Sequence, residues 1–435
     1  MAYARKLSVT QLKLKTFGYM AAHLWKVFSS MSATCKRIDV VFDIYELGSI
    51  KDIERMRRRK VDPIEVFINR NDTPLPVDIE RFWASSKNKE RLQEFFIKWL
   101  IHKVTQGTEN VSISIYLGGS HEDDLFKCMR ISSQTVADVP TLHCQHNEAD
   151  DRMLLHINHA ICTESFKRVV VASPDTDVLV CLLYHFSETW KFSGLEELWV
   201  LCGQGNTKRA LPVHDLVQTM SRALVSVLPA LHALSGCDTT SKVSTKLSVF
   251  KAAEQGGLEL LKDFGKNNEL SHDVEIKAEQ FLAHAIGGVN IDTFNELRYF
   301  LYHHKSIKNN FEKLVPTSNS IQLHIKRAFL QCYHWINATK ATVDILNPVD
   351  YGYILKDDFL VPLIVSEPNQ PPDFPFPCTC KKCFRSNVCP CRIADIMCCE
   401  FCKCDINGQC SNPRNNIKES HDRSKDSEDG LIVEC

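Results

Sequence analysis

Six acidic residues stand at points of the sequence from which a folded chain could bring their side chains together. One follows an apolar run that predicts a strand, two open a predicted helix, two follow a second predicted strand, and one lies in a glycine-containing turn. In open α/β sheets, ligands bind beyond the carboxyl ends of the strands, which is where most of these residues would lie. The set is Asp43, Glu148, Asp150, Asp175, Asp177 and Asp238.

Carboxylates gathered in this way suit hard divalent cations, which prefer oxygen ligands. Like charges repel unless a cation or a proton neutralises them, so stability gives no reason to collect them. We therefore expect about two Mg²⁺ or Mn²⁺ ions, which could hold the attacking and leaving oxygens of a phosphodiester, and we assign all six residues to metal binding and catalysis. The alternative is local, because Asp175 can cap a helix and Glu148 and Asp150 favour a helix N-terminus.

Basic residues close to the acidic set could contact phosphate groups. Segment 49–60 predicts a helix with a strongly basic end, and further lysines follow the last acidic turn. A solvated helix face or a nuclear import signal is the alternative interpretation of segment 51–60. The candidate nucleic-acid contacts are Lys51, Arg55, Arg58, Arg59, Lys242 and Lys246.

The cysteine-rich end of the sequence carries the most specific local pattern. The chain has 19 cysteines, and many of those near its end form Cys-x-Cys pairs with few apolar residues between them. Because no signal peptide is recognisable, we expect a reducing compartment, where dense cysteines indicate metal more often than disulfides. Nine thiolates would suit about three tetrahedral zinc ions if three thiolates bridge. The predicted ligands are Cys378, Cys380, Cys383, Cys389, Cys391, Cys398, Cys402, Cys404 and Cys410.

Two smaller patterns allow a different chemistry. Cys237 lies in the turn with Asp238 and could be a nucleophile, although a buried structural thiol is the simpler interpretation. His156 and His159 lie three residues apart on one predicted helix face and could hold a metal. Histidines on a helix surface are more often structural, so neither pattern displaces the carboxylate hypothesis.

The elements that must position these residues alternate between strand and helix. Apolar alternation and turn residues predict strands at 36–43, 110–117, 168–172 and 198–201, with helices between them. This order predicts an α/β fold with a mostly parallel sheet and flanking helices, and helical patterns follow beyond residue 245. The expected organisation is an α/β domain at 1–250, a helical region at 251–345, a linker at 346–377, a cysteine-rich zinc module at 378–412 and a disordered tail at 413–435.

Composition limits the choice of partners. The chain of 435 residues can bury a substantial core, and its formal net charge of −1 provides no overall basic field, so nucleic acid would be bound by local patches. No apolar run approaches the roughly 18 residues of a membrane helix. We expect no membrane contact, no small-molecule cofactor, and a nuclear or cytoplasmic location.

The order of the acidic motifs resembles that of the flap-endonuclease-like branch of the PIN nuclease superfamily, over about residues 1–250. Val41-Phe42-Asp43 is similar to that family's strand end, and Glu148-Ala149-Asp150 is similar to its Glu-Ala-Glu pair. Asp175-Thr176-Asp177 and the turn at Asp238 are similar to its last two acidic motifs. The resemblance implies a nuclease fold with two Mg²⁺ or Mn²⁺ ions, and it places phosphate-gripping residues in the basic stretch 51–60.

The chain departs from this family pattern in two places. The family begins with a strand that ends in another metal-binding Asp, whereas a helix is expected close to Met1 here. We therefore expect unpaired backbone groups in the sheet and either a truncated start or impaired catalysis. The family's glycine-rich helix–turn–helix is replaced by segment 239–246, which offers lysines and hydroxyls instead.

The cysteine spacing resembles the tesmin-type CXC domain, a zinc cluster that binds DNA, down to the closing Cys410-Ser411-Asn412. That family contacts DNA through a Tyr or similar residue before the second Cys-x-Cys, where Asn387-Val388 stand here. Nearly the whole chain also resembles a group of animal proteins associated with mobile elements. In that group a nuclease-like domain with Asp-Thr-Asp and Gly-Cys-Asp-Thr-Thr motifs precedes a helical region and a cysteine cluster.

These observations predict a metal-dependent nuclease, or a protein derived from one, acting on structured or single-stranded nucleic acid, with DNA favoured over RNA. The first alternative is a non-catalytic, zinc-dependent DNA-binding protein of mobile-element origin. The second is a protein-interaction module in which zinc only folds the cysteine-rich segment. Salt-sensitive binding to nucleic acid separates the first alternative from the second.

Overall fold

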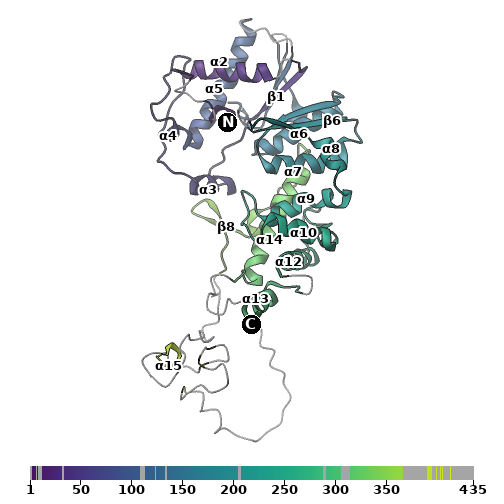
Figure 1. Cartoon of the computed structure of the whole chain (residues 1–435). Helices are drawn as coiled ribbons and strands as arrows, with labels where there is room; N and C mark the ends of the chain where they lie inside the picture. The colour runs from purple at the N-terminus through teal and green to yellow at the C-terminus, as the bar shows by residue number, and fades with distance from the viewer. Residues whose placement is uncertain are drawn as a thin grey trace. The chain divides into compact units, whose positions relative to one another are not determined.

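A computed structural model shows a mixed α/β protein with small mixed sheets and many helices (Figure 1). It describes residues 2–5, 7, 12–31, 34–107, 113–122, 124–132, 135–203, 207–287, 291–304, 314–365, 389–393, 398, 402, 404 and 412. Two compact units divide the chain. The first comprises Met1–Glu275 and His324–Leu363, and the second comprises Ile276–Leu323 and Ile364–Cys435.

Strands account for the smaller part of the structure. They are β1 (Arg37–Val41), β2 (Ser114–Gly118), β3 (Cys128–Ser132), β4 (Thr135–Asp138), β5 (Arg168–Ala172), β6 (Glu197–Cys202), β7 (Arg209–Pro212), β8 (Tyr353–Lys356) and β9 (Phe359–Pro362). The α-helices are α1 (Ala2–Arg5), α2 (Phe17–Met31), α3 (Ile50–Arg57), α4 (Ile79–Trp83), α5 (Ser86–Thr105), α6 (Ala149–Cys162), α7 (Thr176–His185), α8 (Val213–Gln218), α9 (Arg222–Ser235), α10 (Lys246–Ala252), α11 (Leu258–Leu261), α12 (His272–Gly287), α13 (Phe294–His304), α14 (Ser318–Asn337) and α15 (Pro390–Ile393).

The first unit contains two sheets and a hairpin. One sheet has the order β1-β2-β3-β4, and its β1–β2 pair is parallel, with Val40 opposite Leu117. The other has the order β5-β6-β7, and its β5–β6 pair is parallel, with Val171 opposite Val200. The two-stranded hairpin β8–β9 is antiparallel.

The prediction of one mostly parallel sheet is wrong, because the sheets are small and mixed. β3, β4 and β7 pair with their neighbours in antiparallel fashion. The connections 119–127 and 203–208 are shorter than the dozen or more residues that a parallel crossover needs, so the chain turns back on itself. Within the described residues no strand bridges β1 and β5, and each is the terminal strand of its sheet. Val170 of β5 consequently remains 47% exposed.

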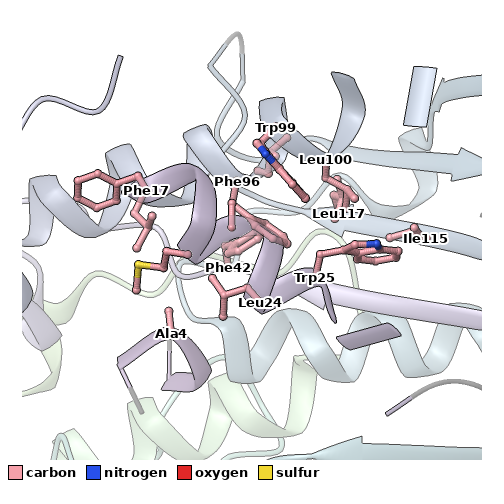
Figure 2. Close-up of a cluster of buried hydrophobic side chains, with 14 of the residues drawn as sticks. Ala4, Phe17, Leu24, Trp25, Phe42, Phe96, Trp99, Leu100, Ile115 and Leu117 are labelled. Atoms are coloured by element: carbon pink, nitrogen blue, oxygen red, sulfur yellow. The ribbon is translucent and has the colours of Figure 1, made fainter. Parts of the chain in front are cut away.

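The core of the first sheet is formed by helices α2 and α5, which lie side by side over it (Figure 1). Phe96 of α5 is buried among aromatic rings, edge-on to Phe42 and stacked on Trp99 (Figure 2). Leu117 of β2 and Leu24 of α2 complete this cluster (Figure 2). Burial of this apolar surface holds β1, and therefore Asp43 just beyond it, in a fixed position.

The regular elements described in the second unit are helices. Glu279 of α12 is buried and accepts hydrogen bonds from the Phe294 amide at 2.9 Å and the Ser318 hydroxyl at 2.6 Å. This carboxylate therefore ties the start of α13 and the start of α14 to α12.

We predict that Phe96→Ala lowers the free energy of unfolding of the first unit by about 3–5 kcal/mol, the usual cost of deleting a buried aromatic ring. Tyr19→Ala on α2 is the control, because its ring is 65% exposed. The control should change stability by no more than about 0.5 kcal/mol. Urea denaturation followed by circular dichroism measures both, and equal midpoints for the two variants would contradict the described core.

Candidate carboxylate site and cysteine cluster

Asp43 lies just past the carboxyl end of β1 and is held by two hydrogen bonds. The amide of Ala149 donates to its Oδ1 at 3.0 Å, and the hydroxyl of Tyr45 donates to its Oδ2 at 3.2 Å. Burial acts to raise the pKa of Asp43, but positive charges, those of Arg55 and Lys51 among them, together with this amide outweigh burial and lower the pKa. Asp43 is therefore an ionised carboxylate attached to the N-terminus of α6.

Glu148 occupies the N-cap position of α6 and faces the basic helix α3. Lys51 Nζ lies 2.8 Å from Glu148 Oε2, and Arg55 Nη2 lies 3.7 Å from Glu148 Oε1. Burial acts to lower the pKa of Lys51, but Glu148 and Asp150 raise it on balance, so Lys51 stays protonated. Lys51 and Arg55 were predicted to contact phosphate, and Glu148 was predicted to bind a metal. In the structure, these two cations neutralise Glu148.

Asp150, in the first turn of α6, is surrounded by other carboxylates. Its pKa is raised well above the ordinary value by burial and by the charges of Asp43, Asp175 and Glu148, against the opposing effect of Lys51. Within the described part of the chain, the Asp150 side chain makes no hydrogen bond or ion pair. The helix N-terminus favours an acidic residue at this position, but burial and the neighbouring carboxylates oppose its ionised form.

Asp175 lies past the end of β5 and has two roles. Its Oδ1 accepts a hydrogen bond from the Asp177 amide at 3.0 Å, so it is the N-cap of α7. The helix-capping interpretation is therefore correct for this residue. Its charge also acts on Asp150, which places it beside the carboxylates from β1 and α6.

Asp177 is paired with a buried histidine. His232 Nε2 donates to Asp177 Oδ1 at 2.7 Å, and Lys246 Nζ donates to His232 Nδ1 at 3.0 Å. The Trp335 ring lies 5.5 Å from the imidazole, centroid to centroid. This Asp–His–Lys chain could not be predicted from the sequence, because its members lie on three different helices. The Lys246 ammonium group contacts His232, although the residue is exposed.

Asp238 lies in an exposed turn and contacts the C-cap residue of the basic helix α3. Arg58 Nη2 donates to its Oδ1 at 3.0 Å. This hydrogen bond is the largest influence on the pKa of Asp238 and lowers it, with help from the charges of Lys51 and Arg55 and against burial. Lys51 and Arg55 therefore act on both Asp238 and Glu148.

The two alternative sites have structural partners. Cys237 is half-buried, and its Sγ contacts the hydroxyls of Thr239 at 3.4 Å and Thr240 at 3.2 Å. His156 Nδ1 donates to Asp39 of β1 at 2.7 Å, and His159 Nδ1 accepts from Arg37 at 3.0 Å. The histidine pair attaches α6 to β1, as the structural interpretation of these residues predicts.

Four of the six carboxylates, those of Asp43, Glu148, Asp150 and Asp175, act on one another electrostatically. Asp238 joins them through the basic helix α3, and Asp177 is held by His232. In the described residues, groups of three or more potential ligand atoms within 4.8 Å of one another are formed only by cysteines. The carboxylates thus act on one another but are not close enough to form a preassembled ligand set. Of the remaining predicted contacts, Arg59 and Lys242 are exposed.

The cysteine cluster is partly described, and it could bind a metal ion such as zinc. Two triplets have ligand atoms within 4.8 Å of one another, Cys389–Cys391–Cys398 and Cys398–Cys402–Cys404. Cys398 belongs to both, and the Asn412 amide donates to its Sγ at 3.3 Å. Cys378, Cys380, Cys383 and Cys410 lie outside the described residues.

No disulfide joins the described thiols of this cluster to one another. The Sγ atoms of Cys389 and Cys398 are 3.8 Å apart, as are those of Cys391 and Cys402, whereas a disulfide requires about 2.05 Å. Burial and the nearby Cys402 raise the pKa of Cys391 to about 12. Metal binding would therefore release protons and should weaken as the pH falls.

Comparison with known proteins gives no assignment: no family model, curated protein or solved structure matches the chain. In the described part of the structure, every helix is too short or too polar to cross a membrane.

We predict that Asp150→Asn stabilises the protein at neutral pH in buffer without added Mg²⁺ or Mn²⁺. Because the folded pKa of Asp150 is raised, its ionised form costs stability, and the wild type regains this stability as the pH falls through that pKa. A gain of about 0.5–2 kcal/mol is typical when such functional strain is removed. Thermal melts between pH 4 and 8 should show a difference that shrinks at low pH.

The matched control for this prediction is Asp215→Asn. Asp215 is exposed in the first turn of α8, so the change removes the same favourable interaction with a helix N-terminus but no cluster of carboxylates. It should be neutral or slightly destabilising. An Asp150→Asn protein that melts at or below the wild-type temperature would show that the carboxylates do not repel one another.

We predict that Cys398→Ser lowers the zinc content more than Cys404→Ser does, because Cys398 belongs to both cysteine triplets. Zinc per chain is measured by plasma mass spectrometry on purified full-length protein. Cys162→Ser is the control, since Cys162 is exposed, free and distant in sequence from the cluster, and it should leave the zinc content unchanged. Equal zinc in the Cys398 and Cys404 variants would refute a shared ligand.

Proposed function

We propose that the chain is a metal-dependent phosphodiester hydrolase, or a protein derived from one, that acts on structured or single-stranded nucleic acid. One observation supports this proposal above the others. Carboxylates from three separate segments, at the ends of β1 and β5 and at the start of α6, gather around Asp150 against their mutual repulsion. Function is the usual reason for keeping such an arrangement.

The donor set suits Mg²⁺ or Mn²⁺. The oxygen ligands are those of hard cations, and Asp150 has no partner within the described residues although it is half-buried. Asp43, Glu148, Asp150 and Asp175 would hold one ion, and Asp177 and Asp238 would complete a second position. A bound ion of this kind lowers the pKa of its water and neutralises charge on phosphoryl oxygens.

The chain's own residues would orient these ligands and the substrate. The Tyr45 hydroxyl and the Ala149 amide fix the Asp43 carboxylate, and His232 fixes that of Asp177. Lys51 and Arg55 pair with Glu148 in the described structure. When Glu148 turns to a cation, these two side chains become available to phosphate oxygens.

The order of the acidic motifs supports a PIN-like, flap-endonuclease-like ancestry as part of this proposal. Asp43 follows β1, Glu148 and Asp150 begin α6, and Asp175 follows β5, as that resemblance implies. DNA is the favoured substrate, and a nuclear location would accord with a basic segment at 51–60.

A second function, zinc-dependent binding of nucleic acid without catalysis, is supported by the cysteine cluster alone. Its two triplets could fold a small module around metal, whatever the carboxylates do. This alternative keeps the mobile-element origin and treats the first unit as a scaffold.

The decisive measurement is hydrolysis of flap, hairpin and single-stranded DNA in Mn²⁺. We predict that Asp43→Asn and Asp150→Asn each lower the rate by at least about a hundredfold, since each removes charge that orients a reacting group. Asp62→Asn, at an exposed position away from the cluster, is the control and should retain the wild-type rate.

Three outcomes separate the two functions. Metal-dependent cleavage lost in both variants supports the hydrolase. Equal rates in the wild type and in both variants would eliminate it. Salt-sensitive DNA binding that survives Asp150→Asn, but is lost on zinc chelation or in Cys398→Ser, would support the non-catalytic function.

A further inference from the structure

Two cations from different helices converge on the ring of Tyr45. The guanidinium carbon of Arg55, on α3, lies 4.8 Å from the ring centroid, and Lys89 Nζ, on α5, lies 5.3 Å from it. Both side chains are half-buried and Tyr45 is buried. Since the Tyr45 hydroxyl donates to Asp43, this pair of cations adjoins the carboxylate site.

Lys89 is a charge without a counter-charge. Within the described part of the chain it makes no ion pair or hydrogen bond through its ammonium group. It lies in the first turn of α5, which contains no acidic residue. A helix N-terminus carries partial positive charge and disfavours a cation, so this position is unfavourable for lysine on local grounds too.

The groups that face Lys89 are mostly cationic. Its pKa is lowered to about 8, mainly by burial and also by Arg55 on α3, Arg5 on α1 and Arg59 just after α3, while Asp43 acts in the opposite direction. Arg55 is itself held only loosely by an acid, at 3.7 Å from Glu148. A bound anion would relieve each of these unfavourable interactions at once.

We propose that Lys89 and Arg55, over the ring of Tyr45, form a binding site for one phosphodiester group of a nucleic-acid strand that passes Asp43. The choice of phosphodiester rests on the proposed function. The site itself rests on the unpaired lysine, the loosely held arginine and the aromatic floor. Arg offers a planar fork of donors and Lys a compact charge, which together suit a tetrahedral anion.

Binding of a fluorescently labelled single-stranded oligonucleotide to the full chain tests this site in buffer without added Mg²⁺ or Mn²⁺. We predict that Lys89→Gln weakens binding about tenfold at pH 7 and reduces the slope of log K against log salt by about 0.7, the value for one lost contact to a single strand. Lys87→Gln is the control, because Lys87 is exposed two residues away on the same helix. It should have a clearly smaller effect.

The pH dependence provides a second readout that misfolding cannot imitate. Wild-type binding should weaken as the pH rises through about 8, where Lys89 loses its proton. Lys89→Arg stays charged and should bind at pH 9 as it does at pH 7. Equal affinity of the wild type and Lys89→Gln at pH 7, or the same pH profile for wild type and Lys89→Arg, would overturn the site.

Inorganic phosphate serves as the remaining probe. If inorganic phosphate binds at Lys89 but Lys89→Gln does not weaken oligonucleotide binding, the assignment to a phosphodiester is wrong. The hydrolysis assay is independent of these measurements. If the protein cleaves DNA but Lys89→Gln does not affect binding, the proposed Lys89 site is wrong and the proposed hydrolase function is retained. If binding depends on Lys89 but no cleavage is seen, the site is retained and the hydrolase function is wrong.

Discussion

The pairing of two carboxylates, the half-buried Glu148 and the exposed Asp238, with the cations of α3 and its C-cap is the interaction on which the first unit's site depends. Lys51 and Arg55 face Glu148, and Arg58 faces Asp238, so one short helix neutralises acids from α6 and from the turn after α9. The helix can do this only because it is anchored at its start. Ser49 caps it, the buried Asp52 accepts from the Gly48 amide, and the Gly48 carbonyl accepts from Leu360 of β9. At the φ of +75° that Gly48 adopts, a side chain would be strained and would meet the Asp358 carbonyl.

Local sequence patterns predicted the elements that carry the carboxylates. Strand 168–172 has the predicted bounds, and the strand before Asp43 and the helix opened by Glu148 lie where alternation and acidic first-turn residues indicated. The antiparallel strands β3, β4 and β7 were not predicted from the sequence, because they are short and show little apolar alternation. α8 and α9 are separate helices, since Ser221 caps a new helix that continues to Ser235.

Long-range polar contacts could not be predicted from spacing, because each side chain had a plausible local role. Asp177 follows a strand, as a metal ligand would, yet it accepts a hydrogen bond from His232. In the sequence, His232 is only one histidine on an apolar helix, so this pairing could not be predicted. Asp39 stands in the middle of β1, where an acid is costly to bury without partners. An acid in the middle of a strand therefore indicates that polar partners lie nearby, and Arg37 and His156 are these partners.

At the proposed sites, the balance of charge predicts that metal and nucleic acid would favour each other's binding. Glu148 is neutralised by Lys51 and Arg55, whereas Asp150 and Lys89 have no oppositely charged group in contact with them among the described residues. A divalent cation at the carboxylates would compensate Asp150 and compete with Lys51 and Arg55 for Glu148. A phosphate at Lys89 and Arg55 would draw Arg55 from Glu148 and so favour a metal there. The two ligands would therefore strengthen each other's binding through the Arg55–Glu148 pair, and such a coupling is reciprocal by thermodynamic necessity.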